Sequence, residues 1–168
     1  MSGAHLNPAV TLAAASGGIF SWREVPWYTG AQVAGGAAGS VLAHVMFGLR
    51  WYSISTHAGP GWAPALSEFV ATFGLIAVIA MCSEFKPDAI PVAVAAYIMS
   101  AYWFTPSTSF ANPAATIARS ISTTFAGIRP ADVPLFVAAQ LAGAAAATFV
   151  GRWTSGRRAP AVSLRAGT

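Results

Sequence analysis

An internal repeat constrains the fold of this chain more than any other feature of its sequence. The segment Asn7-Pro-Ala-Val-Thr-Leu-Ala13 returns as Asn112-Pro-Ala-Ala-Thr-Ile-Ala118, with five of seven residues identical. Ala31-Gln-Val-Ala-Gly-Gly-Ala37 returns in the same way as Ala139-Gln-Leu-Ala-Gly-Ala-Ala145. The offsets are 105 and 108 positions, so both matches belong to one duplication, and the fold is expected to consist of two related halves.

Each copy predicts a short helix that begins at an Asn-Pro pair. Asn is a preferred N-cap and Pro a preferred first helical residue, which assigns these roles to Asn7-Pro8-Ala9 and Asn112-Pro113-Ala114. Residues 2–5 and 106–111, before each pair, suit extended chain. Ten helical residues reach only ~15 Å, about half of a hydrocarbon core of ~30 Å. We therefore expect two re-entrant segments, residues 1–16 and 106–122, each returning as a half-helix.

The composition is that of a multi-spanning membrane protein. Hydrophobic residues make up 55% of the 168 positions and charged residues 8%, against about 25% charged in a soluble domain. The net charge of +4 does not indicate a nucleic-acid partner, because the basic residues do not form one patch and four of nine lie after position 151. Cys82 stands alone, and the three His residues show no ligand spacing, so we expect no metal site and no cofactor.

Four full spans are expected at residues 26–49, 63–83, 89–105 and 133–153. The spacing Gly35-xxx-Gly39 in the first of them favours close approach of a neighbouring helix. Three spans separate the two half-helices, so the half-helices enter from opposite faces and can meet at the midplane, as in an inverted repeat. With the first loop on the cytoplasmic side, six of the nine basic residues lie inside, which predicts a cytoplasmic C-terminus.

This arrangement predicts a pore for neutral, hydrogen-bonding solutes. The amides of Asn7 and Asn112 would donate to a passing oxygen, and the positive ends of the two half-helices would oppose cations. Loop carbonyls would accept hydrogen bonds; the candidates are Gly3, Ala4, His5, Phe110 and Ala111. No bond is made or broken in such a passage, and the chain shows no set of residues for intramembrane catalysis, so we expect no enzyme.

The chain resembles the major intrinsic proteins, the family of aquaporins and aquaglyceroporins. The resemblance rests on Ser2-Gly-Ala-His-Leu-Asn-Pro-Ala-Val-Thr11, on Asn112-Pro-Ala114, on the pairs Ala31-Gln32 and Ala139-Gln140, and on Glu68. It implies an all-α membrane protein: an inverted-repeat helical bundle with two re-entrant half-helices, assembled as a homotetramer. Members have six full spans and this chain four, so we expect the first two helices, about 60 residues, to be missing before Ser2. An open reading frame upstream of Met1 that encodes two apolar spans would show a misplaced start.

The resemblance also assigns domains and a selectivity filter. The membrane domain would cover residues 1–153, followed by a disordered basic tail, 154–168. Filter positions fall on Ser100, Ser109 and Ala115, and the last of these is usually Arg in the family. Small residues at these positions predict that the entrance of the pore is wider and less positively charged than it would be with Arg at position 115. The implied function is a passive channel in the cell membrane for water, glycerol-like polyols or arsenite-type metalloid hydroxides.

Several alternatives stay open at this point. The chain could be a non-conducting truncated fragment, or a secondary transporter that uses Glu68 as its ion-coupling acid. Glu68 could instead be a buried carboxylate that holds loop N–H groups. Arg119 either supplies the positive charge displaced from position 115 or anchors loop carbonyls. Gln32 and Gln140 are expected to give structural support.

Overall fold

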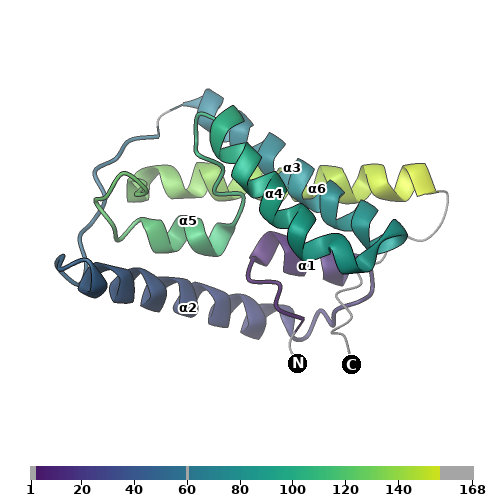
Figure 1. Ribbon diagram of the computed structural model, residues 1–168, viewed down its shortest axis with the longest axis horizontal. Coiled ribbons are helices and arrows are strands. Elements are labelled where there is room, and N and C mark those ends of the chain that lie inside the picture. Colours follow the sequence, from purple (N-terminus) through teal and green to yellow (C-terminus); the bar gives the residue numbers. More distant parts are fainter. Residues whose placement is uncertain (1–2, 60, 156–168) are drawn as a thin grey trace.

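The computed structural model describes residues 3–59 and 61–155, and every regular element in these ranges is a helix or a 3₁₀ turn (Figure 1). The elements are α1 (Pro8–Ser16), α2 (Val25–Met46), α3 (Trp62–Phe85), η1 (Pro87–Ala89), α4 (Ile90–Phe104), α5 (Pro113–Arg119), η2 (Pro130–Asp132) and α6 (Val133–Ser155). The predicted all-α bundle is confirmed. The expected tail begins two residues inside α6, and its remainder lies outside the described residues.

The two Asn-Pro pairs begin helices, as the repeat predicts. Asn7 is the N-cap of the nine-residue α1, and its side-chain oxygen accepts a hydrogen bond from the Ala9 N–H at 2.9 Å. Asn112 caps the seven-residue α5 and accepts from the N–H groups of Ala114 and Ala115 at 3.0 and 3.3 Å. Both helices are far shorter than a membrane is thick, and they lead away from a common centre in opposite directions (Figure 1).

The loops before the two helices are not extended, which corrects the sequence-based expectation. In each loop three residues have positive φ, at positions that correspond in the repeat: Gly3 with Thr108 (78° and 59°), Ala4 with Ser109 (46° and 49°), and Leu6 with Ala111 (52° and 46°). A left-handed residue other than Gly costs roughly 1–2 kcal/mol. Five of the six are not Gly, so surrounding contacts must hold this shape, and the two loops have the same shape.

Among the described helices, α3 and α6 have the most extensive contact with each other. A Cβ atom added to Gly143 of α6 would lie 2.3 Å from the carbonyl oxygen of Phe69 in α3, so only Gly fits at this position. The buried faces of these helices, including Leu75, Ile76 and Ala144, form the core together with α1. The second loop, which precedes α5, packs against this pair of helices.

The Gly-rich helix α2 packs against α5, but not through the predicted glycines. Gly36 faces Ala118, and a Cβ atom there would lie 3.2 Å from the Ala118 Cβ. A Cβ atom at Gly35 or Gly39 would meet no described atom within 4 Å, so the Gly35-xxx-Gly39 face does not make the helix contact expected of it. Gly36 is therefore the glycine of this segment that lies against α5.

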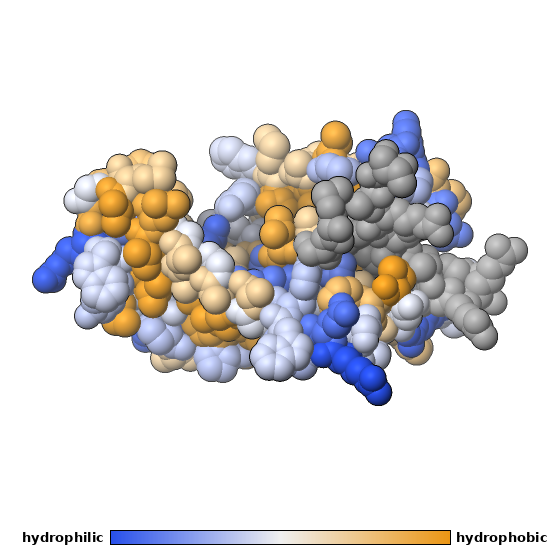
Figure 2. Space-filling model, turned by 90° about the horizontal axis from the view of Figure 1, so that it is seen from below, coloured by the Kyte–Doolittle hydropathy of each residue, from blue (hydrophilic) through white to orange (hydrophobic). Residues whose placement is uncertain are grey.

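Of the described helices, two are long and apolar enough to cross a bilayer by themselves: α3, and the segment Pro130–Thr154 that contains α6. The other two expected spans, α2 and α4, do not meet this criterion of length and hydropathy. Helix α4 has 15 residues, and α2 contains Gln32, Ser40 and His44 besides four glycines. Large apolar side chains, among them Trp27 and Trp103, are more than 80% exposed, and Figure 2 shows apolar patches between polar ones on one face. Such a surface suits lipid.

Candidate functional site

The N-termini of the two half-helices are joined by a reciprocal pair of hydrogen bonds. Nδ2 of Asn7 donates to the carbonyl oxygen of Ala111 at 2.7 Å, and Nδ2 of Asn112 donates to that of Leu6 at 2.9 Å. Leu6 and Ala111 are equivalent positions in the repeat, each directly before its Asn. Each N-cap side chain therefore holds the opposite loop, and both helix ends lie at one place in the molecule.

A cavity of about 560 Å³ opens beside this meeting point. It is lined by all seven of the predicted pore groups: Asn7, Asn112, Gly3, Ala4, His5, Phe110 and Ala111. The rest of its wall is apolar and comes from the first loop, α1, α3 and α4: Leu6, Val10, Leu75, Ile79, Ile90, Pro91, Val94 and Ile98. No carboxylate is among the lining residues, so the polar groups at the cavity are amides, carbonyls and the positive helix ends.

Glu68 of α3 shapes the second loop. Its side chain is fully buried, and its two oxygens accept hydrogen bonds from the N–H groups of Phe110 and Ala111, both at 2.8 Å. The Ser107 hydroxyl and Gln140 Nε2 also donate to it, both at 2.6 Å. Four donors around one carboxylate offset its burial. They also hold the left-handed turn that places the carbonyl of Ala111 next to Asn7.

A Gln–Thr pair supports each half-helix. Gln32 of α2 donates to Thr11 Oγ1 at 3.0 Å, and Gln140 of α6 donates to Thr116 Oγ1 at 2.8 Å. Each Thr hydroxyl in turn donates to the carbonyl oxygen of the N-cap Asn four residues earlier. The long helices thereby fix the rotation of the half-helices, which decides where the Asn side chains lie.

The three predicted filter residues do not line the cavity. Ser100 is exposed on α4, and its hydroxyl donates to the carbonyl of Ala96 in the same helix. Ser109 is buried in the second loop, and its Oγ has no hydrogen-bond partner among the described residues. Ala115 lies half-buried in the first turn of α5, where its N–H donates a hydrogen bond to the side-chain oxygen of Asn112. Their role in selecting solutes stays a prediction.

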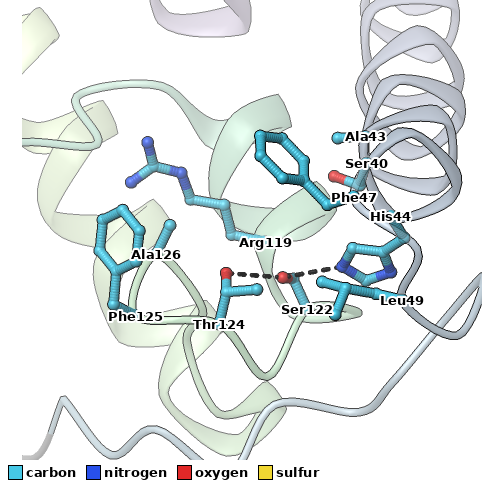
Figure 3. Close-up of a pocket in the computed structure, with 10 residues that line it drawn as sticks. All are labelled: Ser40, Ala43, His44, Phe47, Leu49, Arg119, Ser122, Thr124, Phe125 and Ala126. Atoms are coloured by element: carbon cyan, nitrogen blue, oxygen red, sulfur yellow. Dashed lines mark hydrogen bonds between the residues drawn. The ribbon is translucent and has the colours of Figure 1, made fainter.

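His5 lines the cavity beside the Asn pair, and Arg119 does not. The ring of His5 packs edge-on between Phe20 and Tyr28, and its Nδ1 is 3.1 Å from Thr11 Oγ1. Arg119, the last residue of α5, lies over the ring of Phe110 rather than against loop carbonyls. It also lines a second cavity of about 470 Å³, between the end of α2 and the loop after α5 (Figure 3).

Four residues of the site were not singled out from the sequence. Leu6 supplies an acceptor carbonyl, Ser107 donates to Glu68, and Thr11 and Thr116 connect the half-helices to α2 and α6. The two Thr residues could have been found, because they occupy the same place in both copies, four residues after Asn. Ser107 could have been found in the same way, because its counterpart in the repeat, Ser2, is also a serine.

Comparison with known proteins identifies the family. The family model described as Major intrinsic protein matches residues 1–103. The chain belongs to the major intrinsic protein family. The resemblance that the repeated Asn-Pro-Ala segments indicated is therefore confirmed.

Relatives within the family include bacterial and plant proteins. Aquaglyceroporin AqpS of Rhizobium meliloti (strain 1021) is 51% identical over 153 residues, which cover 91% of this chain and 66% of that protein. Aquaporin NIP1-4 of Oryza sativa subsp. japonica is 40% identical over 158 residues, 89% of this chain and 56% of the relative. The Glycerol uptake facilitator protein of Bacillus subtilis (strain 168) is 40% identical over 88 residues, 45% of this chain and 32% of that protein. The chain thus spans less than two thirds of the length of these relatives.

Proposed function

We propose that the protein is a passive transmembrane channel for small uncharged solutes. The observation that carries this proposal is the reciprocal bonding of Asn7 and Asn112 across two half-helices, beside a cavity of about 560 Å³. A solute hydroxyl in that cavity would meet amide donors and carbonyl acceptors that replace its hydration, while apolar walls keep it from binding tightly. The positive ends of α1 and α5 raise the energy of a cation at the same point.

The solutes we propose are water, glycerol-like polyols and arsenite-type metalloid hydroxides. All are neutral and carry hydroxyl groups or hydroxyl-like oxygens, so the same donors and acceptors serve each of them. Relatives bear the names aquaglyceroporin and glycerol uptake facilitator, which supports the polyols. Ala115, Ser100 and Ser109 are small, and we propose that they leave the mouth wide enough for larger solutes such as methylated arsenicals.

The setting we propose is the cell membrane, with the C-terminus in the cytoplasm, and a homotetramer as the assembly. The apolar lipid-facing surface and the excess of basic residues on one side support this orientation. Tetramer formation is carried over from the family resemblance, and cross-linking in membranes would test it.

Flux through proteoliposomes tests the channel directly. We expect the wild-type protein to raise glycerol flux above that of protein-free vesicles. Asn112→Asp should lower it by about tenfold, because the carboxylate caps α5 but cannot donate to the solute, and one lost hydrogen bond of ~1.4 kcal/mol corresponds to that factor. Thr56→Asp, which adds the same charge on an exposed loop, is the control and should leave flux unchanged. Wild-type vesicles no faster than empty ones would refute the proposal.

The width of the mouth has its own test. Ala115→Arg places a long cationic side chain one turn above the Asn112 amide, and we expect it to reduce flux of methylated arsenicals much more than that of water. Equal flux of the large solute through both proteins would exclude a role for Ala115 in size selection.

A secondary transporter is the competing mechanism, and its candidate acid is Glu68. Both oxygens of that carboxylate accept hydrogen bonds from the second loop or from Gln140, which leaves little capacity for a coupling ion. Transport that saturates at low solute concentration, or that requires a gradient of another ion, would favour the transporter.

A further inference from the structure

Helix α4 forms one side of the cavity beside the Asn pair, and it packs on the core from outside. Its side chains Ile90, Val94 and Ile98 line the cavity from successive turns. Leu75 and Ile79 of α3 continue the same apolar wall and belong to the buried core. Among the described elements, α4 packs mainly against α3, and large apolar side chains on its other faces are exposed. The size of the cavity therefore depends on how α4 is held against α3.

The side chain of Tyr97 joins α4 to α3. Its hydroxyl donates to the carbonyl oxygen of Ala71 at 2.9 Å, and the carbonyl oxygen of Val70 is 3.4 Å away. In the described part of the chain, these are the hydrogen bonds between the two helices. Tyr97 directly precedes Ile98 on α4, and Ala71 lies one turn before Leu75 on α3, so the contact lies next to two residues that line the cavity.

Gly74 of α3 provides the space that the phenol group occupies. A Cβ atom added at this position would lie 2.1 Å from the Tyr97 hydroxyl oxygen and 2.6 Å from the ring carbon that bears it. The ring is rigid, so it could not avoid such a methyl group and still reach the carbonyl of Ala71. The absence of a side chain at Gly74 thus allows the phenol to contact the backbone of α3, and this contact sets the distance between the helices.

We propose that Tyr97 is a positioning residue for the size selectivity of the channel: seated against Gly74, it fixes α4 on α3 and thereby limits the solutes that the cavity admits. The inference rests on the proposed channel function. A displaced α4 would carry the side chains of Val94 and Ile98 away from the second loop and widen the cavity. Larger solutes would then pass more easily, while water, the smallest of the proposed solutes, would gain least.

The ratio of ribitol flux to water flux, measured on the same proteoliposomes, tests this role. Gly74→Ala displaces α4 and should raise the ratio by about tenfold, the lower end of what one methylene in an apolar pocket discriminates. A variant that only folds less well lowers both fluxes equally and leaves the ratio unchanged. Gly30→Ala, on an exposed face of α2 where a Cβ atom meets no described atom within 4 Å, is the matched control and should keep the wild-type ratio.

A compensating variant tests the pair itself. Tyr97→Leu, combined with Gly74→Ala, removes the ring atoms that the new methyl group would meet, so the flux ratio should return toward that of the wild type. A double variant with the same ratio as Gly74→Ala alone would overturn the proposal, because the Tyr97 ring would then not be what displaces α4.

Tyr97→Phe covers the case in which Gly74→Ala does not fold. It keeps the ring in place but removes the hydrogen bond to Ala71, and it should raise the same ratio by about threefold. Folded Gly74→Ala or Tyr97→Phe protein with the wild-type ratio would overturn the assignment. Wild-type vesicles that conduct neither water nor glycerol faster than empty ones would refute the channel itself, which is a separate result.

Discussion

The Asn residues illustrate how much one side chain does at the centre of this molecule. An Asn amide has one oxygen and two N–H bonds. In Asn7 the oxygen caps α1 and one N–H holds the carbonyl of Ala111, so a second N–H is left at the cavity that the residue lines. Asn112 is used in the same way. Asp would keep the cap but lose both donors, and Ser would not reach across to the other loop.

Glu68→Gln is expected to destabilise the protein by about 3 kcal/mol, the cost of weakening hydrogen bonds to a charged group. Each oxygen of Glu68 accepts from two donors, and an amide nitrogen in place of either oxygen would face those N–H or O–H groups. Unfolding in mixed micelles, followed by Trp fluorescence, measures the change. Glu84→Gln, at an exposed position at the end of α3, serves as the control and should change stability by less than about 0.5 kcal/mol.

At the scale of helices, the two halves of the repeat differ in how their long helices are covered. Gly143 of α6 touches the backbone of α3, whereas its counterpart Gly35 in α2 meets no described atom within 4 Å. Both positions are glycine, but of the two only Gly143 lies against another helix of the described chain. Replacing the equivalent glycine is therefore expected to change the free energy of unfolding by different amounts in the two copies.

Gly143→Ala is expected to cost about 1–3 kcal/mol, because the new methyl group would overlap the carbonyl of Phe69 and force α3 and α6 apart. Gly35→Ala is the internal control, since the same change at the equivalent position meets open space. It should be neutral or stabilise by up to about 1 kcal/mol through helix propensity. Comparison of the two unfolding midpoints in one detergent checks this, and equal losses would contradict the packing difference.

At the scale of the whole molecule, the reciprocal Asn bonds make the two halves depend on one another. Each loop is held by the N-cap residue of the other, so loosening one side loosens its counterpart. The Gln–Thr pairs then connect this centre to α2 on one side and to α6 on the other. The position of the half-helices is thus a property of the assembled bundle.

Asn7→Ala and Asn112→Ala should therefore be non-additive. Each single change removes a cap worth about 1 kcal/mol and one bond between the loops. The double variant should lose less than the sum of the single losses, with a coupling of about 1 kcal/mol, because the loss of one bond between the loops already weakens the geometry of the other. A double-mutant cycle measured by unfolding gives this value. Asn7→Ala combined with Thr123→Val, on a separate exposed loop, should be additive.

Much of this fold could be predicted from the repeat. The starts of both half-helices at Asn7 and Asn112 follow from local capping rules and the internal match, and the approximate positions of the long helices follow from the apolar runs. The family was indicated by the resemblance of the motifs. The shape of the loops does not, because Ala and Leu residues rarely have positive φ on their own. In the second loop that shape depends on Glu68, which is about 40 residues away in sequence.

The close contacts between helices and loops also could not be predicted from the sequence. Gly35, Gly36 and Gly39 are alike as residues, and only the position of α5 against α2 distinguishes Gly36 from the other two. Arg119 was open to two interpretations because its neighbours Phe110 and Tyr102 come from another loop and another helix. In both cases the deciding factor is which elements lie side by side in the assembled bundle, and these elements are far apart in the sequence.

The matching left-handed turns of the two loops have a consequence for traffic through such a path. Because Gly3, Ala4 and Leu6 repeat the geometry of Thr108, Ser109 and Ala111 on an oppositely directed segment, a molecule that entered the proposed channel from either compartment would meet similar groups in the same order. The middle of the proposed route would then have no structural preference for entry over exit. Net movement would follow the concentration difference alone, so the same passage could admit a scarce nutrient or release a poison.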